Sequence, residues 1–383
     1  MNARTIHNPR AATPRPSRHV AALTPYDAVS SLRKIEANGS EYPPLKLDWN
    51  ESTIPPSERV VHAIQEFLAG TVPLHWYPDL EARRLREALS VYSGVPADGI
   101  LVTNGSDAAL DLICRTYLDP GDEVLVVWPT YGHFLVFARA RGIVPTEVAA
   151  PDPFAATTGA ILDRLRASTQ LVYLASPNNP TGVVTPAGDV ERLCRASPST
   201  LFVVDEAYHE FCGETCASLI GRVANLIVTR TFSKCFSIAG LRVGYLLASR
   251  EVIGQLSKLH NPKSVNAIGQ VAALAAIEDR AFRERYVAEV RAGADYLVQA
   301  LRERGAAVRN TRANFILIRV ADPARFVRAL EQVAVYVRDR SRIRGFEGFV
   351  RITVGTLEQM QDLVRRLDRL LAAQPDLLAP PDR

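Results

Sequence analysis

The sequence contains very little lysine. Five of its 45 basic residues are lysines, at positions 34, 46, 234, 258 and 263, so that 40 are arginines. Arginine keeps its charge at any useful pH and cannot act as a nucleophile or a base, whereas a lysine amine can form a Schiff base with an aldehyde. A lysine retained where arginine is the default is therefore a candidate for amine chemistry. Lys234 is the strongest candidate, because hydroxyl residues and Arg242 surround it in the segment 231–245, as an anion site requires.

Cysteines are also few, neither sign of charge is in large excess, and long apolar runs are lacking. The five cysteines have no metal-binding spacing, and Cys212 with Cys216 alone would make a poor site, so we expect reduced thiols and no metal. The net charge is only +4, with 41 acids dispersed among the bases. This balance argues against nucleic acid as a partner, and no apolar run reaches membrane-spanning length. The sequence therefore predicts a cytoplasmic protein that binds neither nucleic acid nor membrane.

The chain divides into five segments by composition and pattern. Residues 1–20 contain four arginines, three prolines and no acid, without the amphipathic pattern of a transit peptide, and we expect a flexible leader. Residues 374–383 are predicted to form a polar tail. Between these ends we expect an N-terminal arm at 21–50 that belongs partly to a small domain, a large domain at 51–265, and the rest of the small domain at 266–373.

Seven short apolar, β-branched runs occur in the large domain, most of them separated by helical or loop segments. Such runs are typical of strands buried on both faces of a largely parallel sheet. We therefore predict an α/β fold, with a mostly parallel seven-stranded sheet flanked by helices. The predicted strands are 99–103, 123–128, 144–149, 171–175, 201–205, 226–229 and 243–248. Residues 266–373 have fewer strands, among them 314–320, 335–338 and 350–354, and predict a smaller α+β domain.

Four polar motifs come at or just after predicted strands, where ligands bind in open α/β sheets. In 104–110, Gly105 permits a tight turn, and Ser106 and Asp107 would open a helix whose free N–H groups favour a phosphate. A simple helix cap is the alternative. In 176–182, two prolines and a glycine fix a loop from which the asparagine amides could hold an oxyanion, although turn chemistry alone would also explain that segment.

The other two motifs carry charge. Asp205 ends a predicted buried strand, where a carboxylate is costly unless it is paired, and a protonated ring nitrogen would be a suitable partner. A structural salt bridge or a helix cap is the alternative. Lys234, taken alone, could be a solvated surface lysine. The four motifs follow one another in order with suitable spacing, and the combination is far more specific than any one of them.

Over residues 21–372 the chain resembles the fold type I pyridoxal-phosphate aminotransferases and, within them, the histidinol-phosphate aminotransferase group. The segments that carry the resemblance are 23–26, 47–51, 76–79, 176–182, 231–245 and 350–356. The resemblance implies the fold type I PLP-transferase fold, pyridoxal 5'-phosphate as the cofactor, and a homodimer with shared active sites. It also implies that an amino group passes from a small-molecule amino donor to a 2-oxo acid.

Cofactor-binding roles follow from the resemblance. Lys234 would form the Schiff base and then move the proton between substrate and cofactor carbons, while Asp205 would keep the ring nitrogen protonated. The phenolate oxygen of the cofactor would accept hydrogen bonds from Asn179 and Tyr208, which lowers the pKa of the imine. Tyr131 would stack on the ring. The phosphate would be held by Ser106, Asp107, Thr231, Ser233 and Arg242, and by Tyr77 reaching across a dimer interface.

Substrate roles follow in the same way. Arg351 would bind the α-carboxylate or its counterpart, Arg338 would hold the phosphate of histidinol phosphate, and Tyr26 would lie over the substrate. Some of these residues have an alternative role. Tyr77 could be a core aromatic, Tyr26 a packing aromatic and Tyr131 an ordinary loop aromatic. Arg338 could be one more charge in an arginine-rich chain. The implied reaction transfers an amino group between histidinol phosphate and 2-oxoglutarate by a ping-pong mechanism.

Several positions depart from the group. Ala108 stands where members commonly carry an acid, Lys263-Ser264 replaces an aromatic–asparagine pair, Trp49 is bulky, and residues 338–346 contain four arginines. The cofactor residues look intact, so these departures put the substrate in question rather than the chemistry. A related enzyme with the same cofactor is therefore the alternative: a natural-product aminotransferase or cyclase, or a phosphothreonine-type decarboxylase. A non-catalytic module on the same scaffold is the third hypothesis.

Overall fold

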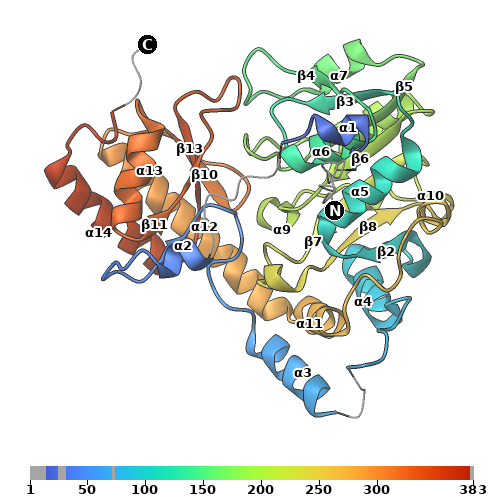
Figure 1. Ribbon diagram of the computed structural model, residues 1–383, viewed down its shortest axis with the longest axis horizontal. Coiled ribbons are helices and arrows are strands. Elements are labelled where there is room, and N and C mark those ends of the chain that lie inside the picture. Colours follow the sequence, from blue (N-terminus) through green and yellow to red (C-terminus); the bar gives the residue numbers. More distant parts are fainter. Residues whose placement is uncertain (1–13, 25–31, 71–73, 380–383) are drawn as a thin grey trace, which may run out of the picture.

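The computed structural model describes residues 14–24, 32–70 and 74–379. Figure 1 shows a large part built around one sheet, in cyan to yellow, beside a smaller part in orange and red. Helix α12 (Arg280–Glu303) extends from the large part into the small one. In the described part of the chain, no helix combines the length and the apolarity needed to cross a membrane.

The large part contains a seven-stranded sheet with the strand order β2-β8-β7-β6-β5-β3-β4. All its pairings are parallel except those of β8, which runs antiparallel to β2 and β7. The prediction of a mostly parallel seven-stranded sheet is confirmed, and each predicted strand overlaps an observed one. The strands are β2 (Ile100–Thr103), β3 (Glu123–Val127), β4 (Thr146–Val148), β5 (Thr169–Ala175), β6 (Leu201–Asp205), β7 (Leu226–Thr231) and β8 (Gly244–Ala248).

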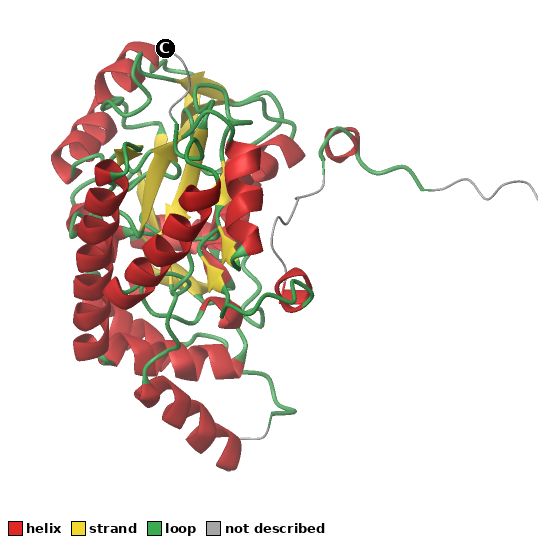
Figure 2. Cartoon of the chain, turned by 90° about the vertical axis from the view of Figure 1, so that its left-hand side faces the viewer, coloured by secondary structure: helices red, strands yellow, loops and turns green. Residues whose placement is uncertain are grey.

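Two apolar cores cover the two faces of this sheet, because successive side chains of a strand point to opposite sides. In β3, Val124 and Val126 belong to one core, whereas Leu125 and Val127 belong to the other. Figure 2 shows helices on both sides of the strands. Burial on both faces explains why the strands read as continuous apolar runs. One core is closed by α5 (Gly105–Tyr117), α6 (Gly132–Ala140) and α10 (Arg250–Leu256), and the other by α4 (Arg83–Ser93), α7 (Thr158–Arg164) and α8 (Ala187–Ala196).

The small part contains an antiparallel four-stranded sheet with the order β12-β13-β10-β9. Its strands are β9 (Ala307–Arg309), β10 (Phe315–Arg319), β12 (Arg338–Asp339) and β13 (Phe349–Thr353), and its helices α12, α13 (Pro323–Gln332) and α14 (Leu357–Ala373). The predicted strand at 335–338 is divided in two. Its first half, β11 (Val335–Tyr336), pairs in parallel with β1 (Leu45–Lys46), which lies far away in the sequence.

The remaining α-helices of the described chain lie in both parts or beside them. They are α1 (Arg18–Ala21), α2 (Leu32–Glu36), α3 (Glu58–Ala69), α9 (His209–Cys212) and α11 (Ala267–Glu278), and α3 packs against α11. Two segments near the ends of the described chain contact the body of the protein. The ring of His19, in the segment predicted as a leader, lies against Gly142, and Leu377 and Leu378, in the segment predicted as a polar tail, are buried.

Candidate active site

A cavity of about 460 Å³ lies at the carboxyl ends of three neighbouring parallel strands. Ala175, Asp205 and Thr231 are the last residues of β5, β6 and β7, and all three line it. This edge of an open α/β sheet is the usual place for a ligand. Residues of β12 and β13 line it from the small part. The predicted site residues that line the cavity are Ser106, Asp107, Tyr131, Asn179, Asp205, Tyr208, Thr231, Ser233, Lys234, Arg242, Arg338 and Arg351.

An anion cradle lies at the start of α5. Gly105 has a φ of +80°, and a Cβ there would come within 2.7 Å of Nη2 of Arg242, so only glycine lets the guanidinium approach the helix start so closely. Nη1 of Arg242 donates a hydrogen bond to Oγ of Ser233 at 3.3 Å, and Oγ1 of Thr231 donates to the same oxygen at 3.0 Å. The free N–H groups of the first helical turn, that of Ser106 included, complete a site suited to phosphate.

Asp107 connects this cradle to Tyr131. Its Oδ1 accepts a hydrogen bond from the Tyr131 hydroxyl at 2.8 Å, and its Oδ2 lies 3.4 Å from Nη2 of Arg242. Burial alone would raise the pKa of Asp107, but hydrogen bonds with His133 and Tyr131 outweigh it and hold the pKa below its ordinary value. Asp107 therefore stays ionised and fixes Tyr131 in the cavity wall.

Asp205, the last residue of β6, is buried beside the cavity. Its Oδ2 accepts a hydrogen bond from the Tyr173 hydroxyl at 3.1 Å, and its Oδ1 accepts one from the Ala207 N–H at 3.2 Å. Burial raises the pKa of Asp205 to about 6. Within residues 14–24, 32–70 and 74–379, no basic side chain forms an ion pair with this carboxylate. Asp205 thus offers a buried negative charge that a cation from outside the chain could neutralise.

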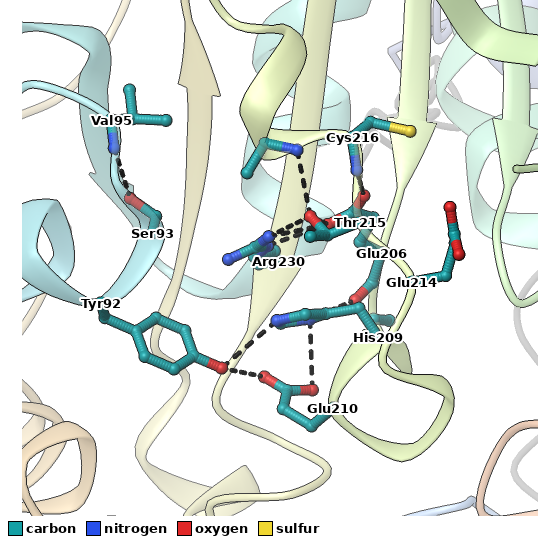
Figure 3. Close-up of polar contacts among 12 residues, drawn as sticks. Tyr92, Ser93, Val95, Glu206, His209, Glu210, Glu214, Thr215, Cys216 and Arg230 are labelled. Atoms are coloured by element: carbon teal, nitrogen blue, oxygen red, sulfur yellow. Dashed lines mark hydrogen bonds and ion pairs between the residues drawn. The ribbon is translucent and has the colours of Figure 1, made fainter. Parts of the chain in front are cut away.

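A buried polar network behind the cavity holds the residues that follow Asp205 (Figure 3). Oε2 of Glu206 accepts a hydrogen bond from Nε of Arg230 at 3.0 Å, and both side chains are buried. Nε2 of His209 lies 3.2 Å from the Tyr92 hydroxyl. Burial lowers the pKa of His209 well below its ordinary value, so this ring stays neutral. These contacts fix the turn that carries Asp205 into the cavity.

Lys234 is half-buried in the same cavity. Its Nζ donates a hydrogen bond to the carbonyl oxygen of Trp49 at 2.9 Å. Burial lowers the pKa of Lys234 to about 8, and the positive charge of Arg351 acts in the same direction. At neutral pH a larger share of this amine is uncharged than in an exposed lysine, and the uncharged amine is the nucleophilic form.

Tyr208, Asn179 and Arg351 meet on one wall of the cavity. The Tyr208 hydroxyl lies 3.1 Å from Nδ2 of Asn50 and 3.4 Å from Nδ2 of Asn179. Arg351 donates from Nη1 to Oδ1 of Asn179 at 2.7 Å and from Nη2 to the carbonyl oxygen of Asp48 at 2.5 Å. Because Arg351 lies on β13 and Asn179 follows β5, this contact joins the two parts of the molecule at the cavity.

Comparison with known proteins identifies the family. The sequence model described as Aminotransferase class I and II matches residues 43–367, which is most of the chain. The chain belongs to this aminotransferase family. A histidinol-phosphate aminotransferase from Moorella thermoacetica is 34% identical to it over 375 residues, which are 95% of each chain. A dihydroxyacetone phosphate transaminase from Campylobacter jejuni is 34% identical over 364 residues, 94% of this chain and 98% of the relative.

A solved structure supports the same identification. The histidinol-phosphate aminotransferase from Sinorhizobium meliloti, in complex with pyridoxal-5'-phosphate, superposes on this aminotransferase with a TM-score of 0.84 and 25% identity. The match covers 95% of this chain and 99% of the other. The predictions of a fold type I aminotransferase that resembles the histidinol-phosphate group, and of pyridoxal phosphate as its cofactor, are confirmed.

The site of this aminotransferase fits the cofactor in three respects. Asp205 is a buried carboxylate that can pair with a protonated ring nitrogen. The cradle around Arg242 offers guanidinium, hydroxyl and N–H groups to a phosphate. Lys234 offers an amine with a lowered pKa to an aldehyde. These groups line one continuous cavity, so one molecule that carries all three functions can contact them together.

Among the predicted site residues that the structure describes, one lies outside this cavity. Tyr77 does not line it, and its side chain is 74% exposed with Nζ of Lys263 4.8 Å from the centre of its ring. A role for Tyr77 at a phosphate would therefore require a second subunit, as the resemblance implied. Tyr26 lies outside the described residues.

Other residues at the site were not recognised in the sequence. Asn50 contacts the Tyr208 hydroxyl, Tyr173 donates to Asp205, and the backbone of Trp49 accepts from Lys234. Tyr173 could have been noticed as the one hydroxyl-bearing residue in the run 171–175. Arg340 also lines the cavity, but among four closely spaced arginines nothing in the sequence distinguished it.

Proposed function

We propose that this aminotransferase moves the amino group of histidinol phosphate to 2-oxoglutarate by a ping-pong mechanism, with pyridoxal phosphate bound at Lys234. The observation that carries the proposal is the placement of Lys234, Arg338 and Arg351 around one cavity. Such an arrangement suits a cofactor bound at the amine and an anionic substrate bound by the two guanidinium groups. Relatives named as histidinol-phosphate aminotransferases, each about a third identical over most of the chain, support the choice of substrate.

Each residue of the chain that lines the cofactor site has a separate role. Pyridoxal phosphate supplies the aldehyde carbon that takes the amino group and a ring that accepts electrons. Lys234 supplies the neutral amine that accepts the proton from the α-carbon of the donor, since its pKa of about 8 lies close to physiological pH. Asp205 would keep the ring nitrogen of the bound cofactor protonated. The amide of Asn179 and the hydroxyl of Tyr208 would donate to its phenolate oxygen.

The two arginines orient the substrates. Arg351 is fixed by Asn179 and by the backbone of Asp48, and its guanidinium fork is suited to a carboxylate or to its counterpart in an amino alcohol. Arg338 binds the phosphate at the other end of histidinol phosphate. The second substrate, 2-oxoglutarate, carries a carboxylate at each end, so the same two arginines can hold it after the first product leaves.

A panel of amines mixed with the holoenzyme tests this proposal. Histidinol phosphate should deplete the absorbance band of the Lys234-bound cofactor faster than histidinol or other amines. Glutamate, the amino donor of the reverse reaction, should deplete the same band. Lys234→Ala should show no such response, and borohydride should label Lys234 in the wild type only. If another amine depletes the band and histidinol phosphate does not, the substrate assignment is wrong.

Dihydroxyacetone phosphate is the second candidate substrate. The relative from Campylobacter jejuni that bears its name aligns over 94% of this chain at an identity equal to that of the relative from Moorella. With glutamate as donor, consumption of dihydroxyacetone phosphate in place of turnover of histidinol phosphate would support this candidate. Release of CO2 without a keto or aldehyde product would instead indicate a decarboxylase.

Assembly and location complete the proposal. We propose a cytoplasmic homodimer in which Tyr77 of one subunit reaches the cofactor phosphate of the other. The exposure of Tyr77 supports this arrangement, because a hydroxyl that does not reach its own cavity is available to a neighbouring subunit.

A further inference from the structure

The four arginines between residues 338 and 346 fall into two pairs. Arg338 and Arg340 are half-buried and line the active-site cavity. Arg342 and Arg344 are exposed and lie outside it, and Arg344 forms an ion pair with Glu147 of the large part. Two of the four arginines therefore line the active-site cavity, and the other two lie on the protein surface.

Strand geometry explains this division. β12 pairs antiparallel with β13, with Arg338 opposite Arg351, and the N–H of Arg340 donates to the carbonyl oxygen of Phe349 at 2.9 Å, which extends the ladder by one residue. Alternate residues of a strand share a face, so Arg340 lies on the same face as Arg338. The intervening Asp339 is bound to Ser341, which donates to Oδ1 from its N–H at 2.7 Å and from its hydroxyl at 2.6 Å.

The charge of Arg340 acts within the reaction chamber. Burial raises the pKa of the Tyr208 hydroxyl, and the charges of Arg351 and Arg340 oppose that rise. Tyr208 lies beside Asn179 at the cofactor end of the cavity. Three guanidinium groups, on residues 338, 340 and 351, thus line the same cavity and offer positive charge and N–H donors to an anion.

The number of these guanidinium groups indicates which kind of anion the pocket binds. Arg351 is oriented by Asn179 and by the backbone of Asp48, as a carboxylate-binding arginine would be. Two further arginines on adjacent positions of one strand face exceed what a second carboxylate requires. A phosphate monoester carries a charge of about −1.5 to −2 at pH 7 and presents three acceptor oxygens, so it can be contacted by two guanidinium groups at once.

We propose that Arg340 is a second phosphate-binding arginine, which with Arg338 makes the pocket select a donor that carries a phosphate dianion over its unphosphorylated or carboxylate analogue. The inference rests on the proposed function and adds to it a specificity-determining residue. It assigns different roles to two arginines that are only two positions apart, Arg340 and Arg342.

The test compares Arg340→Gln with Arg342→Gln as a matched control, both as holoenzymes. For Arg340→Gln the KM for histidinol phosphate should rise about 10- to 100-fold, which corresponds to the loss of a charge-assisted hydrogen bond. The KM for unphosphorylated histidinol should change far less, and kcat should change little with either donor. Arg342→Gln should match the wild type. Arg340→Lys, which keeps the charge but not the planar fork, should lie between.

Inhibition by inorganic phosphate separates this inference from the choice of substrate. In the holoenzyme the cofactor occupies its own phosphate site, so competitive inhibition against the amino donor reports the substrate pocket. The inhibition constant should rise in Arg340→Gln and stay unchanged in Arg342→Gln, whichever donor the panel identifies. Equal behaviour of the two variants, or an equal loss for phosphorylated and unphosphorylated donors, would overturn the proposal. Unchanged cofactor absorbance and melting temperature would show that the variants are folded.

Discussion

Burial shifts the two central groups of the site in opposite directions. It raises the pKa of Asp205 to about 6 and lowers the pKa of Lys234 to about 8, because a low-dielectric surrounding disfavours the charged form of both an acid and a base. Each group is thereby held in a state that a suitable ligand can stabilise. A protonated ring nitrogen would pair with the carboxylate, and an aldehyde would react with the amine to form a Schiff base.

Asp205→Asn should change the pH dependence of stability in the cofactor-free protein. The pKa of Asp205 is higher in the folded state than its ordinary value of 3.8, so the folded protein binds more protons and stability is lost as the pH rises through about 6. Because the pKa rises from 3.8 to about 6, the total loss from this residue is about 3 kcal/mol at pH 7 and above. Between pH 4.5 and pH 7.5 about 2 kcal/mol of this loss should occur, because the rest precedes pH 4.5. Urea unfolding at these two pH values should show that difference in the wild type and not in Asp205→Asn.

The same variant should behave differently with cofactor. Turnover should fall about 100-fold or more, because the ring nitrogen loses its ionic partner, while cofactor still binds through Lys234 and the phosphate cradle. The cofactor-free measurement is independent of activity. A wild type and a variant with parallel pH–stability curves, or a variant with near-normal turnover, would contradict the role given to Asp205.

The junction between β2 and α5 shows how one element builds part of the site. A strand that ends at the sheet edge and a helix that begins there are joined at Asn104 and Gly105, which leaves the first N–H groups of α5 free to bind an anion. Gly105 contributes to this anion site in two ways: it adopts the positive φ of the turn, and its lack of a Cβ lets Arg242 approach the helix start. Arg242 itself adopts a left-handed conformation, with a φ of 53°, at the end of its own short helical turn.

Gly105→Ala should therefore weaken cofactor binding as well as stability. The control is Gly94→Ala, because Gly94 has a similar φ of +73° but nothing within 4 Å of an added Cβ. Both variants should lose about 1–2 kcal/mol of unfolding free energy from the left-handed alanine. Only Gly105→Ala should also raise the dissociation constant of pyridoxal phosphate, measured by fluorescence titration of the cofactor-free protein. Equal cofactor affinity in the two variants would show that the approach of Arg242 does not matter.

At the scale of the whole molecule, exposed apolar side chains gather beside the segment that contains Tyr77. Leu74, Trp76, Tyr77 and Leu80 are 46–74% exposed, although all four are large and apolar or aromatic. An exposed group of this kind is typical of a surface that contacts another protein. The homodimer proposed above would cover it and would bring Tyr77 to the partner's site.

A subunit-mixing experiment tests this assembly. Lys234→Ala and Tyr77→Ala should each be inactive or strongly impaired, because each disables one of the two contributions to a shared site. After the two variants are mixed under conditions that exchange subunits, half of the dimers are hybrids with one intact site, so about a quarter of wild-type activity should return. If no activity returns while light scattering confirms dimers, each site is built within a single subunit.

The sequence predicted the parts of this protein that local patterns control. The seven strands of the large sheet follow from apolar runs that are buried on both faces, and α5 follows from the helix-start signal at Ser106 and Asp107. Within that framework, Asp205 and Ser106 come at strand ends, where chain direction alone brings them to one edge. Lys234 was apparent because arginine replaces lysine almost everywhere else.

Contacts between distant segments could not be predicted from local patterns. The pairing of β1 with β11, the hydrogen bond from Tyr173 to Asp205 and the position of Trp49 at Lys234 join residues whose separation leaves no local signal. The division of the arginines at 338–344 depends on the register of β12 against β13. By itself the sequence determined the strands, the order of the motifs and the reactive amine, since these depend on neighbouring residues. Packing decided which charges face the cavity, because burial and pairing depend on the whole chain.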